Sequence, residues 1–283
     1  MRYDQLFTKL FCQPLLIEPG YRVGLELALV SMMQGRPVEP PQMRKVDEDR
    51  QMARSDQLLE IRGDTAIIHI DGAIDKNLSW MDRLCFDATD LRDVDKALAR
   101  VASDRSIANV LIALDSPGGS FPGVPETAGR VAALSSAGKN TIAFCNDMAC
   151  SAAYWIAAQC DQVFAPASAS VGSIGVYLAI IDQSRRLEEM GLNVQELKSG
   201  DLKTAGAPWK PLTESERDHL QERVDHIGAM FRAAVTSKRD VPDDAMEGQS
   251  FIGDTPGEDF RSALTAGLID AIVPTMEDAL DEF

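Results

Sequence analysis

The sequence predicts an α/β fold in which a mostly parallel β-sheet is covered by flanking helices. Short apolar runs typical of buried strands alternate with segments whose apolar residues recur at helical spacing. Strands joined by helical crossovers lie parallel to one another, with helices on the faces of the sheet. The composition agrees with a compact domain, because 45% of the 283 residues are hydrophobic and 25% are charged.

The chain is expected to divide into an N-terminal extension at 1–57 and a main domain at 58–283. Residues 5–33 have the apolar spacing of two short amphipathic helices, interrupted by proline and glycine. Residues 34–58 are polar, proline-rich and without a period, as in a linker. Residues 1–50 carry seven basic and seven acidic side chains, so the extension has a different surface from the acidic remainder.

Predicted strands and helices alternate from residue 58 onward. The strands are predicted at 65–71, 109–115, 140–145, 162–165 and 193–198, and the helices at 91–103, 123–136, 151–160, 179–190 and about 213–238. In the second strand residues 110–114 are all apolar, which is typical of a strand buried on both faces. The last helix opens with Thr213-Glu-Ser-Glu216, a capping-box sequence that satisfies free backbone N–H groups.

Charge and composition exclude several classes of protein. The net charge of −16 repels nucleic-acid phosphates, so no nucleic-acid partner is expected. No stretch approaches the roughly 18 apolar residues of a membrane-spanning helix, and the start lacks a secretion signal, so we expect a cytoplasmic protein with no membrane span. Five cysteines without a CxxC pair favour buried reduced thiols, and neither a metal nor an organic cofactor is expected.

The first candidate site is Asp115-Ser-Pro-Gly-Gly-Ser120, between a predicted strand and a helix. Adjacent glycines, Gly118 and Gly119, allow unusual backbone torsions and expose N–H groups toward a ligand. The segment therefore suits an oxyanion hole or a phosphate nest, although it matches neither the P-loop nor the GxGxxG pattern. A plain tight turn is the alternative interpretation.

The second candidate is Ser151, which follows the predicted strand 140–145 and opens an apolar helix. Free N–H groups and the positive end of the dipole at a helix start favour a developing oxyanion, so a nucleophilic serine is well placed there. A serine that merely caps the helix is the alternative.

A nucleophilic serine needs a base, and the three histidines have no distinctive context. Lysine is the other choice, provided that burial removes the proton that this side chain normally holds up to pH about 10.4. Lys203 lies in the small-residue segment Ser199-Gly-Asp-Leu-Lys-Thr-Ala-Gly206, where Thr204 is a candidate hydroxyl partner. A solvated surface lysine is the alternative.

Four motifs in order resemble the signal peptide peptidase A-like Ser–Lys peptidases over roughly residues 60–275. They are Ser-Pro-Gly-Gly, Asp-Met-x-Cys-Ser-Ala-Ala-Tyr, Ser-Val-Gly-Ser-Ile-Gly-Val and Lys-Ser-Gly-x-x-Lys. The resemblance implies a ClpP/crotonase-like fold with Ser151 as the nucleophile and Lys203 as the general base. It also implies that Ser173 orients the lysine and that Gly118 and Gly119 form the oxyanion loop.

The residues after the nucleophile depart from this family. Many relatives have glycine one or two positions after the serine, whereas this chain has Ala152 and Ala153. The resemblance assigns Ala152 to the substrate-binding side of the site. Its methyl group narrows the space beside Ser151, so we expect a shifted substrate preference rather than loss of activity.

Two segments are similar to the phage minor capsid protein C type of head-maturation protease, namely Cys12-Gln-Pro-Leu-Leu-Ile-Glu-Pro-Gly-Tyr21 and Asn146-Asp-Met-Ala-Cys-Ser151. This resemblance implies a homo-oligomer that cleaves capsid, portal or scaffold proteins inside a prohead of a phage or prophage. Three alternatives stay open. They are a bacterial peptidase that degrades signal or other short peptides, a catalytically silent capsid-associated module, and a crotonase-type acyl-CoA enzyme, which would not need Ser151 and Lys203 together.

Overall fold

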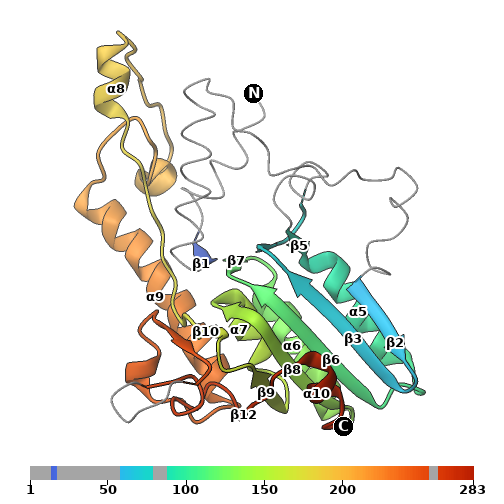
Figure 1. Cartoon of the computed structure of the whole chain (residues 1–283). Helices are drawn as coiled ribbons and strands as arrows, with labels where there is room; N and C mark the ends of the chain where they lie inside the picture. The colour runs from blue at the N-terminus through green and yellow to red at the C-terminus, as the bar shows by residue number, and fades with distance from the viewer. Residues whose placement is uncertain (1–13, 18–57, 79–87, 255–260) are drawn as a thin grey trace.

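A computed structural model describes residues 14–17, 58–78, 88–254 and 261–283 (Figure 1). The predicted N-terminal helices and linker lie outside the described residues, except for a short strand at 15–17. In the main domain, strands and helices alternate along the chain as the sequence predicts.

An eight-stranded sheet forms the centre of the molecule. Its main order is β11-β10-β8-β6-β3-β2, with β9 paired to β8 and β12 paired to β9. Only β2 and β11, at the two ends of this order, pair antiparallel; the other pairs are parallel. The predicted α/β fold with a mostly parallel sheet is confirmed. The strands are β2 (Leu59–Arg62), β3 (Thr65–Asp71), β6 (Asn109–Ser116), β8 (Asn140–Cys150), β9 (Gln162–Ala165), β10 (Ser170–Gly172), β11 (Ser250–Ile252) and β12 (Ala271–Ile272).

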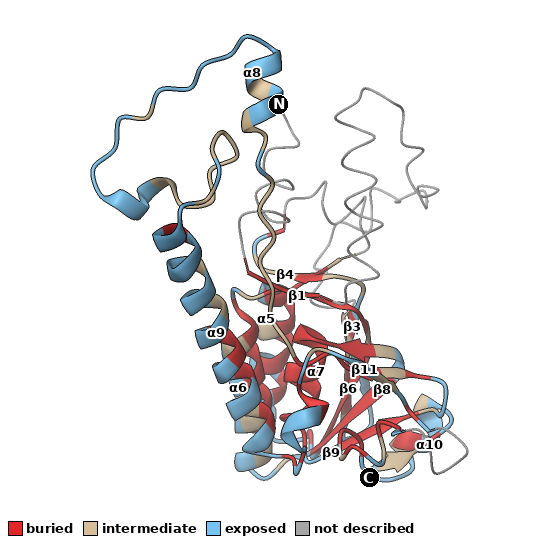
Figure 2. Cartoon of the chain, turned by 90° about the vertical axis from the view of Figure 1, so that its left-hand side faces the viewer, coloured by how far each residue is buried: buried red, intermediate tan, exposed pale blue. Residues whose placement is uncertain are grey.

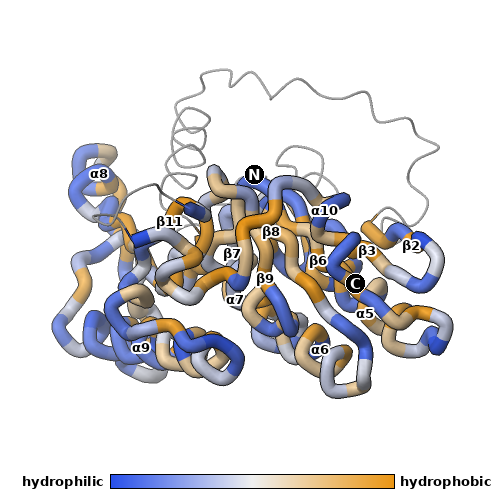
Figure 3. Tube along the Cα trace, turned by 60° about the horizontal axis from the view of Figure 1, so that its bottom comes forward, coloured by the Kyte–Doolittle hydropathy of each residue, from blue (hydrophilic) through white to orange (hydrophobic). Residues whose placement is uncertain are grey.

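Helices cover both faces of this sheet, as predicted. The described helices are α5 (Leu91–Ser103), α6 (Val124–Ser136), α7 (Ala152–Ala157), α8 (Ser184–Glu189), α9 (Glu214–Thr236) and α10 (Met276–Leu280), with short 3-10 helices η2 (Asp201–Thr204) and η3 (Asp243–Ala245). Alternate residues of β6 point to opposite faces. Val110, Ile112 and Leu114 join the larger core with α5, α6 and α7, whereas Leu111 and Ala113 join the smaller core with α10. Burial and hydrophobicity are concentrated on these central strands (Figures 2 and 3).

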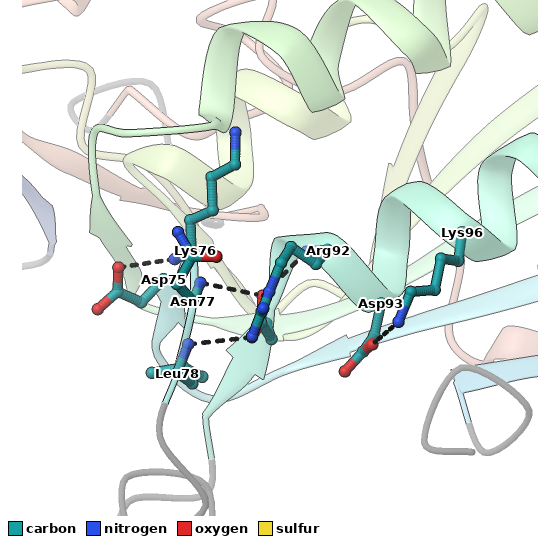
Figure 4. Close-up of polar contacts among 8 residues, drawn as sticks. Asp75, Lys76, Asn77, Leu78, Arg92, Asp93 and Lys96 are labelled. Atoms are coloured by element: carbon teal, nitrogen blue, oxygen red, sulfur yellow. Dashed lines mark hydrogen bonds and ion pairs between the residues drawn. The ribbon is translucent and has the colours of Figure 1, made fainter.

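A second, four-stranded sheet has the order β1-β7-β4-β5. Its strands are β1 (Leu15–Ile17), β7 (Gly118–Ser120), β4 (Ile74–Asp75) and β5 (Thr89–Asp90). The Ser120 hydroxyl donates to Asp75 Oδ1 at 2.6 Å, which joins β7 to β4. The Asp90 carboxylate accepts from the backbone N–H groups of Asn77 and Leu78 and caps α5 (Figure 4). These polar contacts hold the small sheet against the body.

Two elements predicted between residues 179 and 198 differ in the structure. The predicted helix 179–190 is helical only at Ser184–Glu189. The predicted strand 193–198 is wrong, because this segment is extended but pairs with no strand in the described chain. Its two apolar side chains do not cover a core; Val194 is 46% exposed and Leu197 is 100% exposed. An extended segment needs a neighbouring strand to become part of a sheet, and this segment has none in the described residues.

A long arm at 178–213 projects from the body and carries α8 near its tip (Figures 1 and 2). The N–H of Gln183 donates to the carbonyl of Pro208 at 2.7 Å, which joins the two limbs of the arm. The arm then enters α9, whose start has the predicted capping box. The Thr213 hydroxyl accepts from the Glu216 N–H, and the Glu216 carboxylate accepts from the Thr213 N–H.

Three cysteines, Cys145, Cys150 and Cys160, are buried free thiols in the described chain, as predicted. Burial raises the pKa of the Cys160 thiol to about 12, so this side chain stays protonated near neutral pH. Cys12 and Cys85 lie outside the described residues. Across the parts of the chain that the structure describes, no helix is long and apolar enough to cross a membrane.

Candidate active site

The carboxyl ends of three parallel strands bring most of the predicted site residues together. Strands β6, β8 and β10 lie side by side, and Gly172 at the end of β10 pairs with Cys150 at the end of β8. The segments that follow these ends begin with Ser151 and Ser173 and, after β6, with the strand that contains Gly118. Open parallel sheets usually bind ligands at this edge, as the sequence predicts here.

Ser151 has a backbone conformation that is rare for a residue with a side chain. Its φ is +56° and its ψ is −118°, at the sharp turn between β8 and α7. Such torsions in a non-glycine residue cost about 1–3 kcal/mol and are concentrated at functional sites. Two bonds fix the turn, since the Ser151 N–H donates to Gly172 O at 2.7 Å and the Ser151 carbonyl accepts from the Trp155 N–H at 2.9 Å.

The alternative in which Ser151 acts as a helix cap is not supported. Among the described residues, the Ser151 side chain accepts no capping bond from α7. The expected helix 151–160 is also shorter, since α7 ends at Ala157, and so contributes only a small dipole. The position of the hydroxyl group therefore depends on the strained turn and on the packing of α7.

Helix α7 is anchored in the core by aromatic contacts. The Trp155 ring stacks on Phe231 of α9 with the centroids 4.6 Å apart, and the Tyr154 hydroxyl donates to the Leu268 carbonyl at 2.8 Å. Ala152, assigned to the substrate side of the site, is fully buried. A rigid, buried helix directly after the nucleophile restricts movement of the Ser151 backbone.

Only glycine fits at position 118, because three segments approach one another closely there. Its φ is +95°, and a Cβ atom at this position would lie 2.1 Å from Leu16 O, 2.9 Å from Cys150 O and 2.9 Å from Ser151 Cβ. A Cβ on Gly119 would lie 1.7 Å from Ile74 O. The tight-turn alternative is wrong, because these two glycines form strand β7 between β1 and β4.

The Gly118 N–H has an acceptor within the chain. It donates to the Ser116 hydroxyl at 3.2 Å, and that hydroxyl donates to the Gly72 carbonyl at 2.6 Å. The expectation that Gly118 and Gly119 present N–H groups to an oxyanion thus stays a prediction. Ser116, which sequence reasoning missed, holds the first of these two residues in place.

Ser173 lies beside the predicted nucleophile; that it orients the lysine stays a prediction. It follows Gly172, whose carbonyl accepts from the Ser151 N–H. Ser173 has a φ of +52°, is 5% exposed, and donates its N–H to Gln249 O at 2.8 Å. Two buried serines in the left-handed region of backbone torsions therefore occupy neighbouring strand ends.

Lys203 is separate from this pair of serines. It lies exposed on η2 in the arm, in a pocket that Gly200, Leu202 and Ser215 help to line. In the described residues no hydrogen bond or ion pair joins Lys203 to Ser151 or Ser173. The structure thus brings the predicted nucleophile and its neighbouring serine together but does not bring the predicted base to them within one chain.

The turn that carries Lys203 is held by a second lysine. Lys198 Nζ donates to the Asp201 carbonyl at 3.1 Å and to the Thr204 hydroxyl at 3.5 Å, on either side of Lys203. Thr204, expected as the hydroxyl partner of Lys203, is therefore bonded to Lys198 instead. Lys198 is in turn paired with Glu196 at 3.4 Å. Sequence reasoning missed this contact, although both lysines belong to the Lys-Ser-Gly-x-x-Lys motif.

Glu196 links this turn to the start of α9. Its carboxylate accepts from Trp209 Nε1 at 2.8 Å, and this hydrogen bond is the main reason that its pKa is lowered. Lys210 lies 3.6 Å from Glu196 and donates to Glu216 at 2.5 Å. The bond from Lys210 and the bond from the Thr213 N–H lower the pKa of Glu216 to about 2. We call Glu196, Lys198, Trp209, Lys210 and Glu216 the arm network.

Acidic side chains lie close to the strand ends. The pairing of β6 with β8 shifts between Leu114 and Ser116, and bulges of this kind occur often next to active sites. Burial raises the pKa of Asp115, and the nearby carboxylates of Asp147 and Asp71 raise it further. Within the described ranges, no group of histidine, cysteine or acidic residues has the arrangement of a metal site.

Comparison with known proteins identifies a family match in the second half of the chain. The model of peptidase family S49 matches residues 133–282, which include Ser151, Ser173 and Lys203. Gly118 and Gly119 lie before the matched range.

Two phage proteins and one bacterial protein are among the individual relatives. The head-tail preconnector protein GP5 of Enterobacteria phage P21 is 26% identical over 95% of this chain and 55% of its own length. The capsid assembly protease C of Escherichia phage lambda is 30% identical over 65% of this chain and 42% of its own length. The putative signal peptide peptidase SppA of Enterococcus faecium is 30% identical over 65% of this chain and 52% of its own length. The chain thus spans about half the length of these relatives.

Proposed function

Because the chain belongs to peptidase family S49, we propose that it is a serine endopeptidase that uses a Ser–Lys dyad to cleave protein substrates. The observation that carries this proposal is Ser151, a buried serine held at φ +56° between a strand end and a helix. Such strain persists only where the surrounding structure imposes it, and it suits a nucleophile that must be presented at one angle.

The proposed reaction is an acyl transfer. Ser151 Oγ attacks the scissile carbonyl carbon while its proton passes to the neutral amine of Lys203, and the tetrahedral intermediate carries the negative charge on the carbonyl oxygen. Backbone N–H groups at Gly118 or Gly119 stabilise that oxyanion. The C–N bond then breaks, Lys203 gives its proton to the leaving amine, and water hydrolyses the acyl-enzyme. Ser173 is proposed to orient the lysine.

The exposed position of Lys203 supports a role for a second copy of the chain. Lys203 lies on the arm, away from the buried serines, and the arm exposes Met190, Leu192 and Leu197. Exposed apolar side chains gathered on one projection are typical of an interaction surface. We therefore propose a homo-oligomer in which the arm of one copy supplies Lys203 to Ser151 of its neighbour.

The substrates are proposed to be capsid, portal or scaffold proteins of a phage or prophage. The names of two relatives, a head-tail preconnector protein and a capsid assembly protease, support this class. The site of action would be the prohead, assembled in the host cytoplasm. The similarity to a putative signal peptide peptidase favours one alternative, the degradation of signal or other short peptides.

The experiment that tests the proposal is co-expression with the capsid, portal and scaffold proteins encoded beside this chain. The wild type, Ser151→Ala and Lys203→Ala are compared by intact-mass analysis of every partner, with Ser136→Ala and Lys238→Ala as matched controls at exposed positions. Defined fragments should appear with the wild type and both controls only. Loss of a nucleophile or base typically lowers kcat by about 10⁴-fold or more, so neither site variant should yield fragments.

Mixing the two inactive variants tests whether a second copy of the chain supplies Lys203. Ser151→Ala and Lys203→Ala, co-expressed as differently tagged chains, should together regain activity, because some sites then combine an intact serine with an intact lysine. No recovery in a confirmed mixed oligomer would overturn the proposed exchange of Lys203. No fragment from any partner, combined with cleavage of short apolar peptides by the wild type alone, would favour the bacterial alternative. Cleavage of neither, with no labelling of Ser151 by a fluorophosphonate, would favour a silent module.

A further inference from the structure

Strand β1 (Leu15–Ile17) lies between two backbone edges next to the nucleophile. On one side it pairs antiparallel with β7, with Leu16 opposite Gly119. On the other side Leu15 exchanges two hydrogen bonds with Tyr177, at 2.9 and 3.2 Å. An extended peptide that adds to a sheet edge makes the same kind of main-chain contacts.

The carbonyl group of Leu16 is close to Ser151. Both Leu16 O and Ser151 Cβ lie within 3 Å of the point that a Cβ on Gly118 would occupy. Ser151 is only 1% exposed in this arrangement. A peptidase nucleophile must reach the carbonyl carbon of its substrate, so a chain segment in this position blocks access for any other peptide.

We infer that Leu15–Ile17 occupies the peptide-binding cleft of the Ser151 site as an internal pseudosubstrate and must leave it before a substrate enters. This inference rests on the proposed function and names the substrate class. Substrates bind as extended strands between β7 and Tyr177, with apolar side chains on either side of the reacting bond.

Burial of β1 supports the apolar preference. Leu15, Leu16 and Ile17 are each 5% exposed or less, and Leu16 packs in the larger core, so this position accepts a large aliphatic side chain. Burial of such side chains stabilises binding. The same energy holds the pseudosubstrate in place, so release requires a competing peptide or a change at the cleft.

The first test measures peptide binding without catalysis. A fluorescent peptide with the sequence Gln-Pro-Leu-Leu-Ile-Glu is titrated into Ser151→Ala alone and into Ser151→Ala combined with Leu16→Asp, which disfavours β1 in the apolar cleft. Only molecules whose cleft is open can bind the peptide, so occupation by β1 lowers the apparent affinity for the peptide in proportion to the fraction that is open. The double variant should therefore bind the peptide about ten-fold more tightly or more. Ser151→Ala with Ile61→Asp, at an exposed position in β2, is the control and should bind like Ser151→Ala.

Equal affinity of the Leu16→Asp and Ile61→Asp double variants would overturn the inference and make β1 a permanent strand of the small sheet. A Gln-Pro-Leu-Asp-Ile-Glu peptide should bind poorly in every case. Circular dichroism establishes that each variant is folded.

The second test does not depend on the stability of Leu16→Asp. Cysteines at Leu15→Cys and Tyr177→Cys tether β1 in the cleft when oxidised, with each single variant as a control. The reduced double variant should label with a fluorophosphonate at Ser151 like the single variants, and the oxidised form should label at least about ten-fold more slowly. Equal labelling of both forms overturns the inference. Absence of labelling even in the wild type would instead count against the proposed function, and the peptide titration would still decide the inference.

Discussion

The two halves of the proposed dyad are built in different ways. Ser151 and Ser173 are buried at the ends of adjacent parallel strands, and both have positive φ angles imposed by the surrounding sheet. Lys203 lies exposed on the arm, on a turn held by side-chain hydrogen bonds and ion pairs. Folding of the core fixes the nucleophile, whereas charge pairs fix the base. The two halves should therefore respond to different perturbations.

Trp155→Ala should give the largest decrease in the free energy of unfolding, because it disrupts the core that holds the serine half. Removing a buried tryptophan that stacks on Phe231 should lower the free energy of unfolding by about 3–5 kcal/mol. Lys203→Ala, at an exposed position, should change it by less than about 0.5 kcal/mol. Urea denaturation followed by circular dichroism measures both. Equal losses in the two variants would contradict the division into a core half and a surface half.

Lys198→Met should affect the lysine half alone. It removes the ammonium that bonds the Asp201 carbonyl and the Thr204 hydroxyl, so the turn that carries Lys203 loses its fixed position. Because misplacement of a reacting group by about 1 Å can cost about 10²-fold, we expect kcat to fall by about 10- to 100-fold with KM unchanged.

The controls for this prediction are Lys238→Met, which should match the wild type, and Lys198→Arg, which should recover part of the activity. Peptide hydrolysis and thermal unfolding are measured on the same samples. A decrease in kcat that follows a decrease in the unfolding temperature would indicate a general loss of structure instead of a positioning role.

Ser151→Gly should stabilise the fold while it abolishes activity. Glycine adopts φ +56° without the strain of about 1–3 kcal/mol that serine has there. Part of this gain is offset, because glycine has more conformational freedom in the unfolded chain. The expected gain in the free energy of unfolding is about 1 kcal/mol. Ser151→Ala is the matched control, because it also lacks the hydroxyl but keeps Cβ, and it should show no such gain.

The arm network should also give a pH dependence of stability. The pKa of Glu216 is about 2 in the folded chain and about 4.3 in an unfolded one, so its ionised form is favoured by folding. This contribution is fully present above pH about 4.3 and disappears as the pH falls toward 2. The difference in the free energy of unfolding between the wild type and Glu216→Gln should therefore shrink over that range. A difference independent of pH would show that Lys210 does not act on Glu216 through charge.

Much of the serine half follows from the sequence. The apolar run 110–114 predicts a buried parallel strand, and strand ends in such a sheet share one edge, which is where Ser151 lies. The positive φ angles of Ser151 and Ser173 were beyond prediction, because serine has no intrinsic preference for that region and tertiary contacts impose it. The same holds for β1, a three-residue strand whose partners lie about 100 residues or more along the chain.

The lysine half is less predictable. Residues 193–198 were predicted as a strand, but they pair with no neighbouring strand in the described chain. The place of Lys203 depends on Lys198, Glu196 and Trp209, and no periodicity encodes such side-chain contacts. The capping box at Thr213 was predictable because its contacts are local.

The arm is one continuous insertion in the body, and its two limbs are joined where the Gln183 N–H donates to the Pro208 carbonyl. Substitutions, insertions or exchange of the whole segment between homologues therefore leave the strand ends that carry Ser151 untouched. In evolutionary terms the arm can change in sequence and length apart from the sheet, provided that the turn at Asp201–Thr204 that carries Lys203 is kept. Chimaeras with exchanged arms are therefore a practical way to alter the proposed assembly without altering the sheet.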